Sequence, residues 1–288
     1  MVIVVNWNNE PDTRACLESV LSDPEPERTV VLVDNGSSDG SGTRIAQEFG
    51  DRIVFIQSPK NLGYAGANNL GIRWGMENGY RYFFLLNNDA ECQPGVLRRL
   101  LRVAEASPRA GVVGPKILYH GTEQVWFAGG RVDEETGKTW HYTSDKALQL
   151  PVDVDYVSGC ALLVSREVVD AVGLMPEDYF LYYEETEWCT RALRAGFKVL
   201  YVPDAVVVHK ISRTVGSRSE KFYYYFYRNR VLFVRRMTQK LTARFYLRLT
   251  VDLLRESIKA LLARDYRPLA AALDGVRAGL QGEVGEHP

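Results

Sequence analysis

Apolar and polar positions alternate with two different periods along the first third of the chain. Short runs of apolar, largely β-branched residues lie at 2–7, 29–34, 52–57 and 82–87. Segments with helical spacing of apolar residues follow them at 11–21, 41–49, 66–78 and 94–106. Strands that alternate with helices in regular order favour parallel pairing with crossover connections. The pattern therefore predicts an open, mostly parallel α/β sheet with helices on both faces.

The pattern changes after residue 110. Shorter strands and glycine-rich turns at 111–165 predict a small antiparallel sheet, with "SGCALLVS" at 158–165 as a hairpin. A helix is expected at 183–195, followed by two β-rich runs, "KVLYVP" and "AVVVHK", of which the second contains His209. A long helical region then begins with "EKFYYYFYRNRVLFVRR".

The helical region carries an amphipathic pattern. Apolar residues at 247, 251, 254, 258 and 261 recur at helical spacing, and Arg248, Arg255 and Lys259 lie off this stripe. We therefore expect two units: an α/β domain at 1–235 and a basic, amphipathic helical extension at 236–288.

Composition narrows the class of protein. The chain has 288 residues, of which 46% are hydrophobic, so it can bury a large core and is not disordered overall. The four cysteines lie far apart, which argues against a zinc site or a redox dithiol. No export signal and no apolar run of about 20 residues is visible. We expect a cytoplasmic protein with reduced thiols.

Charge is distributed unevenly. Residues 210–267 hold 15 Lys or Arg against 4 Asp or Glu, whereas residues 1–209 hold 19 against 29. An acidic body with a basic C-terminal segment predicts that this segment meets an anionic partner.

The strand ends carry polar side chains. Ligands of open α/β sheets bind beyond the carboxyl ends of the strands. The residues at these ends are Asn6 and Asn8, Asp34 and Asn35, Lys60 and Asn61, and Asn87, Asn88 and Asp89. Asp34, the last residue of its strand, can accept hydrogen bonds from a base or a ribose. The last triplet offers carboxylate and amide oxygens, which suit Mg²⁺ or Mn²⁺. Turns and helix caps are the structural alternative at each of these positions.

Glycine-rich loops follow two of the strands. In "KNLGYAGANNLG" at 60–71, small residues around Gly63 leave room for a ligand against the backbone at a helix start, with Asn61 and Asn68 beside it. An ordinary loop that enters a helix is the alternative. Neither this loop nor "VDNGSSDGSG" at 33–42 has the glycine pattern of a phosphate loop or of a dinucleotide site.

Seven segments carry a resemblance to a known family. They are "VVNWN", "VDNGSSDGS", "NLGYAGANNLG", "LLNNDAE", "SGCALLVSREVV", "YFLYYEETEWCTRALRAGFKVLYVPDAVVVHK" and "YRNRVLF". Together they resemble the family 2 inverting glycosyltransferases with the Rossmann-like GT-A fold, in particular the rhamnosyltransferase-like branch, over residues 1–235. The family's metal motif is D-x-D-like. Here it matches Asn87, Asn88 and Asp89, so an amide replaces the first carboxylate. The resemblance also implies that His209 approaches the same cation.

The segment "YYEETEWCTRALRAG" supplies the candidate base. On a helix, Glu184 and Glu187 share a face and Glu185 points away from it. As a structural alternative, these acids complement the helix dipole, and Glu187 pairs with Arg191. The resemblance places the catalytic base at Glu185, with Glu184 as the second choice. A carboxylate there would take the proton of an acceptor hydroxyl.

Further residues are candidates around the donor and the acceptor. The cations suited to a diphosphate or to an anionic acceptor are Lys210, Arg213, Arg218 and Arg228, although solvated or membrane-facing positions are alternatives. Gly159 and Cys160 are expected on the acceptor side. Trp188 is either a core residue or a platform under a sugar ring.

The predicted protein is thus a metal-dependent, non-processive glycosyltransferase. It would move a sugar from dTDP-rhamnose or a UDP-sugar to a saccharide or lipid-linked saccharide in cell-surface polysaccharide synthesis. A catalytically impaired nucleotide-sugar-binding protein of the same fold is the alternative. Nucleotidylyltransferases and NAD(P)-linked oxidoreductases need glycine-rich loops after the first strand, and "NWNNEPDT" has none. We expect no nucleic-acid partner.

The basic helices have two candidate partners. One is the anionic inner leaflet of the cell membrane, since each basic residue near such a surface contributes about 1 kcal/mol. The other is protein: the apolar stripe packs on the catalytic domain or on a second subunit of a homodimer.

Overall fold

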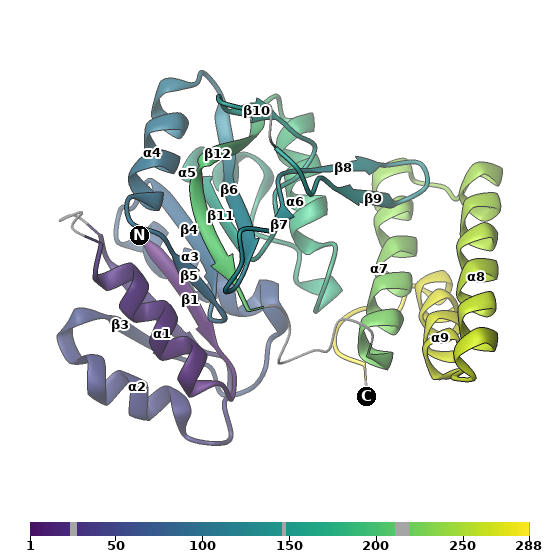
Figure 1. The fold of residues 1–288 in the computed structure, drawn as a ribbon, viewed down its shortest axis with the longest axis horizontal. Helices are drawn as coiled ribbons and strands as arrows, with labels where there is room; N and C mark the ends of the chain where they lie inside the picture. Colours follow the sequence, from purple (N-terminus) through teal and green to yellow (C-terminus); the bar gives the residue numbers. More distant parts are fainter. Residues whose placement is uncertain (24–27, 146–147, 211–218, 288) are drawn as a thin grey trace.

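The computed structural model describes residues 1–23, 28–145, 148–210 and 219–287. Within them the main sheet has ten strands in the order β10-β12-β6-β11-β4-β1-β2-β3, with β5 added to β12 and β7 to β6 (Figure 1). The strands are β1 (Val2–Asn6), β2 (Val30–Asp34), β3 (Val54–Gln57), β4 (Tyr82–Asn87), β5 (Ala90–Cys92), β6 (Ala110–Tyr119), β7 (Val125–Phe127), β10 (Val152–Asp153), β11 (Ala161–Ser165) and β12 (Lys198–His209). A separate antiparallel pair consists of β8 (Gly130–Asp133) and β9 (Lys138–His141).

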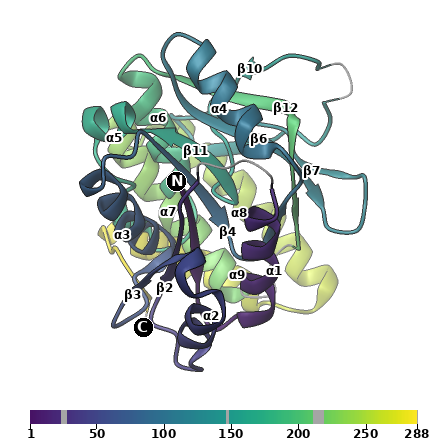
Figure 2. The same cartoon turned by 90° about the vertical axis from the view of Figure 1, so that its left-hand side faces the viewer.

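The helices connect and cover these strands. They are α1 (Glu10–Leu21), α2 (Ser41–Phe49), α3 (Gly63–Glu77), α4 (Val96–Ala106), α5 (Arg166–Val172), α6 (Glu184–Arg194), α7 (Glu220–Thr238), α8 (Ala243–Ala263) and α9 (Arg267–Gln281), with short 3-10 turns at Gly50–Arg52 (η1) and Glu177–Tyr179 (η2). Helices α1 and α2 lie on one face of the parallel strands and α3 lies on the other (Figure 2). The open α/β sheet, the small antiparallel sheet and the C-terminal helices expected from the sequence are confirmed.

The parallel half of the sheet brings the polar strand ends together. Strand β1 pairs in parallel with β2 and β4, and the register sets Asn6 beside Asp34 and Val5 beside Asn87. Strand β2 is buried along its whole length because helices cover both of its faces. The carboxyl ends of β4, β1 and β2 therefore form one polar edge.

Two sequence predictions about strands are wrong. The segment 158–165 does not form a hairpin; its β11 part is a buried strand inserted antiparallel between β4 and β6. All five residues of β11 are buried, which explains its uninterrupted apolar character. The two β-rich runs before His209 form one strand, β12, whose pairing with β6 shifts register between Val202 and Val206.

The C-terminal helices build a second core. Residues of α7, α8 and α9 pack together with Tyr179 and Tyr183, and this cluster is separate from the core of the main sheet. The three helices lie side by side at one end of the molecule (Figure 1). The expected domain boundary at residue 235 falls inside α7.

Helix α8 turns an apolar stripe to solvent. Its exposed members are Leu247, Leu254, Ile258, Leu261 and Leu262, with exposed fractions between 58% and 79%. Phe245 and Leu249, on the opposite face, are buried against the other helices. The stripe therefore does not pack on the catalytic domain, which corrects one of the two expectations for it. No helix in the described residues is long and apolar enough to cross a membrane.

Candidate active site

A hydrogen-bonded network occupies the polar edge of the sheet. The Asn6 amide nitrogen donates to Asp34 Oδ1 at 2.9 Å and to Ser41 Oγ at 2.9 Å, and the Asn6 amide oxygen accepts from Thr13 Oγ1 at 2.9 Å. Asn88 Nδ2 extends the network by donating to Thr13 Oγ1 at 2.8 Å. The side chains of β1, β2, α1, α2 and the segment after β4 thus hold one another in place.

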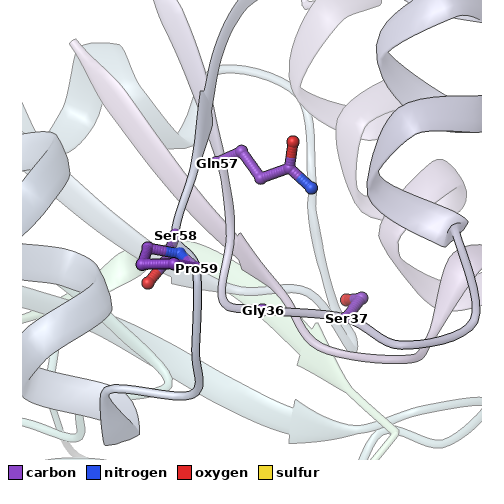
Figure 3. Close-up of a pocket in the computed structure, with 5 residues that line it drawn as sticks. All are labelled: Gly36, Ser37, Gln57, Ser58 and Pro59. Atoms are coloured by element: carbon purple, nitrogen blue, oxygen red, sulfur yellow. The ribbon is translucent and has the colours of Figure 1, made fainter.

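A cavity of about 350 Å³ lies beside this network, beyond the ends of β2 and β3. Its lining residues are Gly36, Ser37, Gln57, Ser58 and Pro59 (Figure 3). Gly36 has a φ of +73°, and a Cβ there would lie 2.5 Å from the backbone of Lys60. A glycine is therefore required for the two loops to approach each other. Asn35 joins the same loops by donating to Asn61 Oδ1 at 2.9 Å.

A second cluster pairs Asp89 with His209. Strand β5 pairs antiparallel with β12 and sets Ala90 beside His209, which brings the preceding Asp89 next to the imidazole. Asp89 Oδ1 lies 3.0 Å from His209 Nε2, and both side chains are buried. His209 Nδ1 is a buried nitrogen that has no hydrogen-bond partner among the described residues.

This pair fits a hard divalent cation. Neighbouring ligands of octahedral Mg²⁺, each about 2.1 Å from the ion, lie about 3 Å apart. Asp89 Oδ1 and His209 Nε2 have this separation, which is also that of the direct hydrogen bond between them. Among the described residues no group of three or more His, Cys, Asp or Glu side chains converges. The other ligands of such an ion would therefore come from amide oxygens, water or a bound phosphate, as is usual for Mg²⁺.

The two acids at the start of α6 form a third cluster. Glu184 is buried, and its Oε2 has no hydrogen-bond partner among the described residues. Burial, reinforced by the charge of Glu185, raises the pKa of Glu184 well above its usual range. Glu185 is half-buried. Burial raises the pKa of Glu185 to about 7, although backbone amides at the helix start act in the opposite direction. A carboxylate with this pKa is suited to proton transfer at neutral pH.

The turn at 159–160 connects the second and third clusters. The Tyr64 hydroxyl donates to the Gly159 carbonyl. Burial raises the pKa of Tyr64, and the charges of Glu184 and Glu185 add to this effect. Burial also raises the pKa of Cys160, with a contribution from the charge of Asp89. The acid pair and Asp89 therefore act electrostatically on groups at the same turn.

The other predicted residues differ in their exposure and in their hydrogen-bond partners. Lys60 is exposed, Asn61 is half-buried, and Gly63 opens α3. Asn8 is exposed and accepts a hydrogen bond from the Ser38 amide at 2.9 Å. Asn68 is buried and donates to the Tyr64 carbonyl at 3.0 Å. Gly159 is half-buried, and so is Asn87, the first residue of the D-x-D-like triplet.

Three predicted residues have surroundings that differ from the expected ones, and a fourth, Trp188, takes one of its two expected roles. Asn6 and Asp34 are almost fully buried and bond to each other, so they shape the loops instead of facing a ligand. Arg228 is 1% exposed and donates to the carbonyls of Tyr179 and Gly285, which leaves it no access to a diphosphate. Trp188 is a core residue that donates to the Gly173 carbonyl, which excludes a sugar platform. Arg213 and Arg218 lie outside the described residues.

Sequence reasoning missed three residues of the site. Thr13 links Asn6 to Asn88, Ser37 lines the cavity, and Tyr64 bonds to the 159–160 turn. Ser37 and Tyr64 stand inside the glycine-rich segments that indicated the site, but a serine in a turn and an aromatic residue in a helix are too common to single out.

Comparison with known proteins identifies the family. The sequence model described as "Glycosyl transferase family 2" matches residues 1–173, more than half of the chain. The chain belongs to glycosyltransferase family 2. This glycosyltransferase is 29% identical over 237 residues to an N-acetylglucosaminyl-diphospho-decaprenol L-rhamnosyltransferase of Mycobacterium tuberculosis, covering 75% of this chain and 77% of the relative.

Two further comparisons extend over nearly the whole glycosyltransferase. The low-salt glycan biosynthesis hexosyltransferase Agl10 of Haloferax volcanii is 28% identical over 294 residues, covering 99% of this chain and 92% of the relative. Among solved structures, a mannosyltransferase of Pyrobaculum calidifontis in complex with GDP-Man and Mn²⁺ superposes with a TM-score of 0.64. That comparison has 18% identity and covers 98% of this chain and 86% of the other. It confirms the GT-A fold.

Proposed function

We propose that this family 2 member is a metal-dependent, non-processive inverting glycosyltransferase whose catalytic base is Glu185. The observation that carries the proposal is a half-buried carboxylate with a pKa of about 7 at the first turn of α6. A general base works best when its pKa lies near the operating pH. Glu185 takes the proton of an acceptor hydroxyl as the oxygen attacks the anomeric carbon. The bond from that carbon to the diphosphate oxygen breaks on the opposite side, so configuration inverts.

The polar edge of the sheet and the cavity beside it form the donor site. The cavity at Gly36, Ser37 and Gln57 has room for the base and ribose of a nucleotide. The network around Asn6 and Asp34 keeps the surrounding loops in one conformation, which lowers the entropy cost of binding. Lys60 and Asn61 lie in the loop that faces Gly36. Lys60 is exposed and available to the donor, whereas the Asn61 amide oxygen already accepts from Asn35 and from the Gly63 amide.

Asp89 and His209 would hold Mg²⁺ or Mn²⁺, with Asn87 as a further oxygen ligand. When bound, the cation neutralises charge on the departing nucleoside diphosphate. Because an amide replaces the first carboxylate of the D-x-D-like triplet, Asp89 is its one charged ligand.

The relatives support a proposal for the substrates. We propose dTDP-rhamnose as the donor, with UDP-sugars next, and a hydroxyl of a saccharide or lipid-linked saccharide as the acceptor. Support comes from the mycobacterial relative, whose name specifies L-rhamnose transfer to a diphospho-decaprenol-linked sugar. The Haloferax volcanii relative is a glycan biosynthesis hexosyltransferase by name. The proposed process is cell-surface polysaccharide synthesis.

A screen of nucleotide sugars tests the donor and the metal together. Thermal unfolding is measured with each donor, with and without Mn²⁺, for the wild type, Asp89→Ala and the exposed control Asp51→Ala. A donor should raise the Tm of the wild type and the control in the presence of Mn²⁺, and this gain should vanish in Asp89→Ala. Equal stabilisation of all three proteins regardless of Mn²⁺ means that the metal assignment is wrong. Donor binding without release of nucleoside diphosphate in the presence of acceptors would favour the impaired binding protein.

The exposed stripe of α8 fits the surface of an anionic bilayer. Residues 240–267 carry seven Lys or Arg against three Asp or Glu. With 100° of rotation per residue, Arg248, Arg255 and Lys259 project along one flank of the stripe. Apolar residues bounded by basic ones are typical of helices that lie in a membrane interface. A lipid-linked acceptor would be reached from that position.

Co-sedimentation with vesicles tests the membrane assignment. The wild type should bind vesicles that contain phosphatidylglycerol and should not bind vesicles of phosphatidylcholine alone. The double substitution Leu254→Ser and Ile258→Ser should abolish the binding, whereas Leu273→Ser, an exposed leucine of α9, should not. Dimers in solution that the double substitution dissociates, without vesicle binding by the wild type, would instead show that the stripe is a homodimer interface.

A further inference from the structure

The loop that precedes the proposed base has an unusual backbone. Phe180, Tyr182 and Tyr183 have φ angles of 64°, 68° and 76°, in the left-handed region that residues with side chains rarely adopt. Tyr183 is the N-cap of α6, so the loop determines where the first turn of that helix lies. Such a backbone persists only when its surroundings hold it in place.

Two adjacent residues of α7 bind this loop from one side. Asn229 Nδ2 donates to the carbonyl oxygens of Tyr179 at 3.0 Å, Leu181 at 2.5 Å and Tyr182 at 2.9 Å. Arg228 Nη2 donates to the Tyr179 carbonyl at 2.7 Å, and its Nε donates to Asn229 Oδ1 at 2.9 Å. Asn229 and Arg228 are 0% and 1% exposed, so water cannot replace these donors.

The start of α3 and the C-terminal tail also bind the segment that precedes α6. The Phe180 carbonyl accepts from the Tyr64 amide at 3.0 Å, at the start of α3. A Cβ at Gly63 would lie 2.6 Å from that carbonyl oxygen, so the contact is close. The Gly285 amide donates to the Asp178 carbonyl at 2.7 Å, and the Gly285 carbonyl accepts from Arg228 at 2.7 Å. The loop at 179–183 thus lies between the donor site and the C-terminal helices.

We propose that Asn229 and Arg228 are positioning residues: they hold the 179–183 loop in its left-handed backbone and thereby fix the position of the Glu185 carboxylate. Their role rests on the proposed function of Glu185 as the base. They act through the loop and do not contact the reacting atoms. The inference replaces the expected diphosphate role of Arg228, and it gives the C-terminal helices a part in catalysis.

The chemistry of the two side chains matches this role. An Asn amide offers two N–H groups that can be shared among several carbonyls, and the planar Arg guanidinium reaches two carbonyls and the neighbouring Asn at once. Lysine carries the same charge on a single nitrogen and cannot replace this fork. If the loop relaxes, water gains access to Glu185, and its pKa returns toward its ordinary value.

Kinetics of Asn229→Ala and Arg228→Lys test the proposal. We expect kcat to fall at least tenfold in Asn229→Ala and about three- to tenfold in Arg228→Lys, because small displacements of a catalytic group have large effects on rate. The donor KM should change less than threefold. The acid limb of the pH profile should move to lower pH in both variants. If Asn229→Ala does not fold, kcat, the donor KM and the pH profile of Arg228→Lys test the proposal.

The control substitution is Arg235→Gln. Arg235 also lies on α7 and donates to two carbonyls, those of Gly279 and Leu280 in α9, but it does not contact the 179–183 loop. It should lower the Tm while leaving kcat and the pH profile unchanged. If Arg235→Gln loses as much kcat as the Asn229 and Arg228 variants do, at the same loss of Tm, the effect on kcat is one of general stability and the proposal is overturned. Folded Asn229 or Arg228 variants with wild-type kcat and pH profile would overturn it as well.

Hydrogen exchange separates this proposal from the proposed function. In Asn229→Ala, peptides that cover residues 177–187 should exchange faster, including the Glu187 amide that bonds to the Tyr183 carbonyl. Peptides of β1 and β2 should not change. Unchanged exchange at 177–187 contradicts the positioning role. If exchange at 177–187 is faster in Asn229→Ala but the wild type turns over no donor, the loop is held by Asn229 as proposed and the proposed function is rejected.

Discussion

The candidate site contains two clusters of buried polar side chains, and they differ in how many of their polar atoms have hydrogen-bond partners. Around Asn6 and Asp34, the amide and carboxylate groups find partners at normal hydrogen-bond distances in Ser37, Ser41 and Thr13. At the start of α6, one oxygen of the buried Glu184 has none among the described residues, and Glu185 stands next to it.

The difference indicates which cluster builds the site and which one reacts. A satisfied buried network is rigid and specifies one conformation. Buried carboxylates without enough partners favour the protonated form, which moves the pKa toward the pH at which an enzyme works. We therefore propose that the strand-end network serves as scaffold for the donor and that the acid pair is the place for proton transfer. Four predictions separate these two roles.

The largest effect is expected at the acid pair. Glu185→Gln keeps the shape of the side chain but removes its capacity to accept a proton. We expect kcat to fall about 10³-fold, within the range attributed to a general base, while donor binding is retained. Release of nucleoside diphosphate measures the rate, and the exposed Glu18→Gln is the matched control. A Glu185→Gln enzyme with more than a tenth of the wild-type rate would exclude Glu185 as the base.

The pH profile should report the same carboxylate. The base must be deprotonated to act, and its pKa is about 7. Below that pH, kcat/KM should fall about tenfold per pH unit, which amounts to about 100-fold at pH 5. Initial rates at saturating Mn²⁺ between pH 5 and 9 measure this profile. A kcat/KM that stays constant down to about pH 5.5, as expected for a glutamate with the ordinary pKa of 4.5, would contradict the raised pKa.

The scaffold cluster should respond in stability and not in chemistry. Asn6→Ala removes the donor to Asp34 and Ser41 and the acceptor for Thr13. Buried groups left without partners cost about 1–3 kcal/mol of unfolding free energy. Urea unfolding should show this loss, whereas Gln47→Ala, at an exposed position of α2, should stay within about 0.5 kcal/mol of the wild type. An unchanged unfolding free energy in Asn6→Ala would mean that the network is not structural.

Local patterns in the sequence predicted the scaffold well. The four parallel strands end within a residue or two of the expected positions, because apolar runs that stop at amides and carboxylates are local signals. Asp89 and His209, 120 positions apart in the chain, do lie together. The family resemblance brought them to attention, because a single His at a strand end carries no metal signal of its own.

The loop before α6 could not be predicted, because its partners leave no trace in the pattern. Asn229 and Arg228 bind backbone carbonyls of Tyr179 and its neighbours, and any residue offers a carbonyl. The cationic character of Arg228 suggested an anionic ligand, yet its burial excludes one. The left-handed φ angles at Phe180 and Tyr182 were equally invisible, since glycine is the usual marker of such positions.

The smallest effect distinguishes the two acids from each other. Burial raises the pKa of Glu184, so the folded protein keeps a proton there at a pH at which the unfolded chain has lost it. Stability from this group is complete below about pH 4.5 and is lost as the pH rises toward the folded pKa. Gln has no proton to lose. Glu184→Gln should therefore have a Tm close to that of the wild type near pH 5 and a higher Tm at pH 8. Thermal unfolding between these two values measures the change. If the two proteins show parallel curves of Tm against pH, Glu184 has the same pKa in the folded and unfolded states. The contrast with the hydrogen-bonded network around Asn6 would then depend on Glu185 alone.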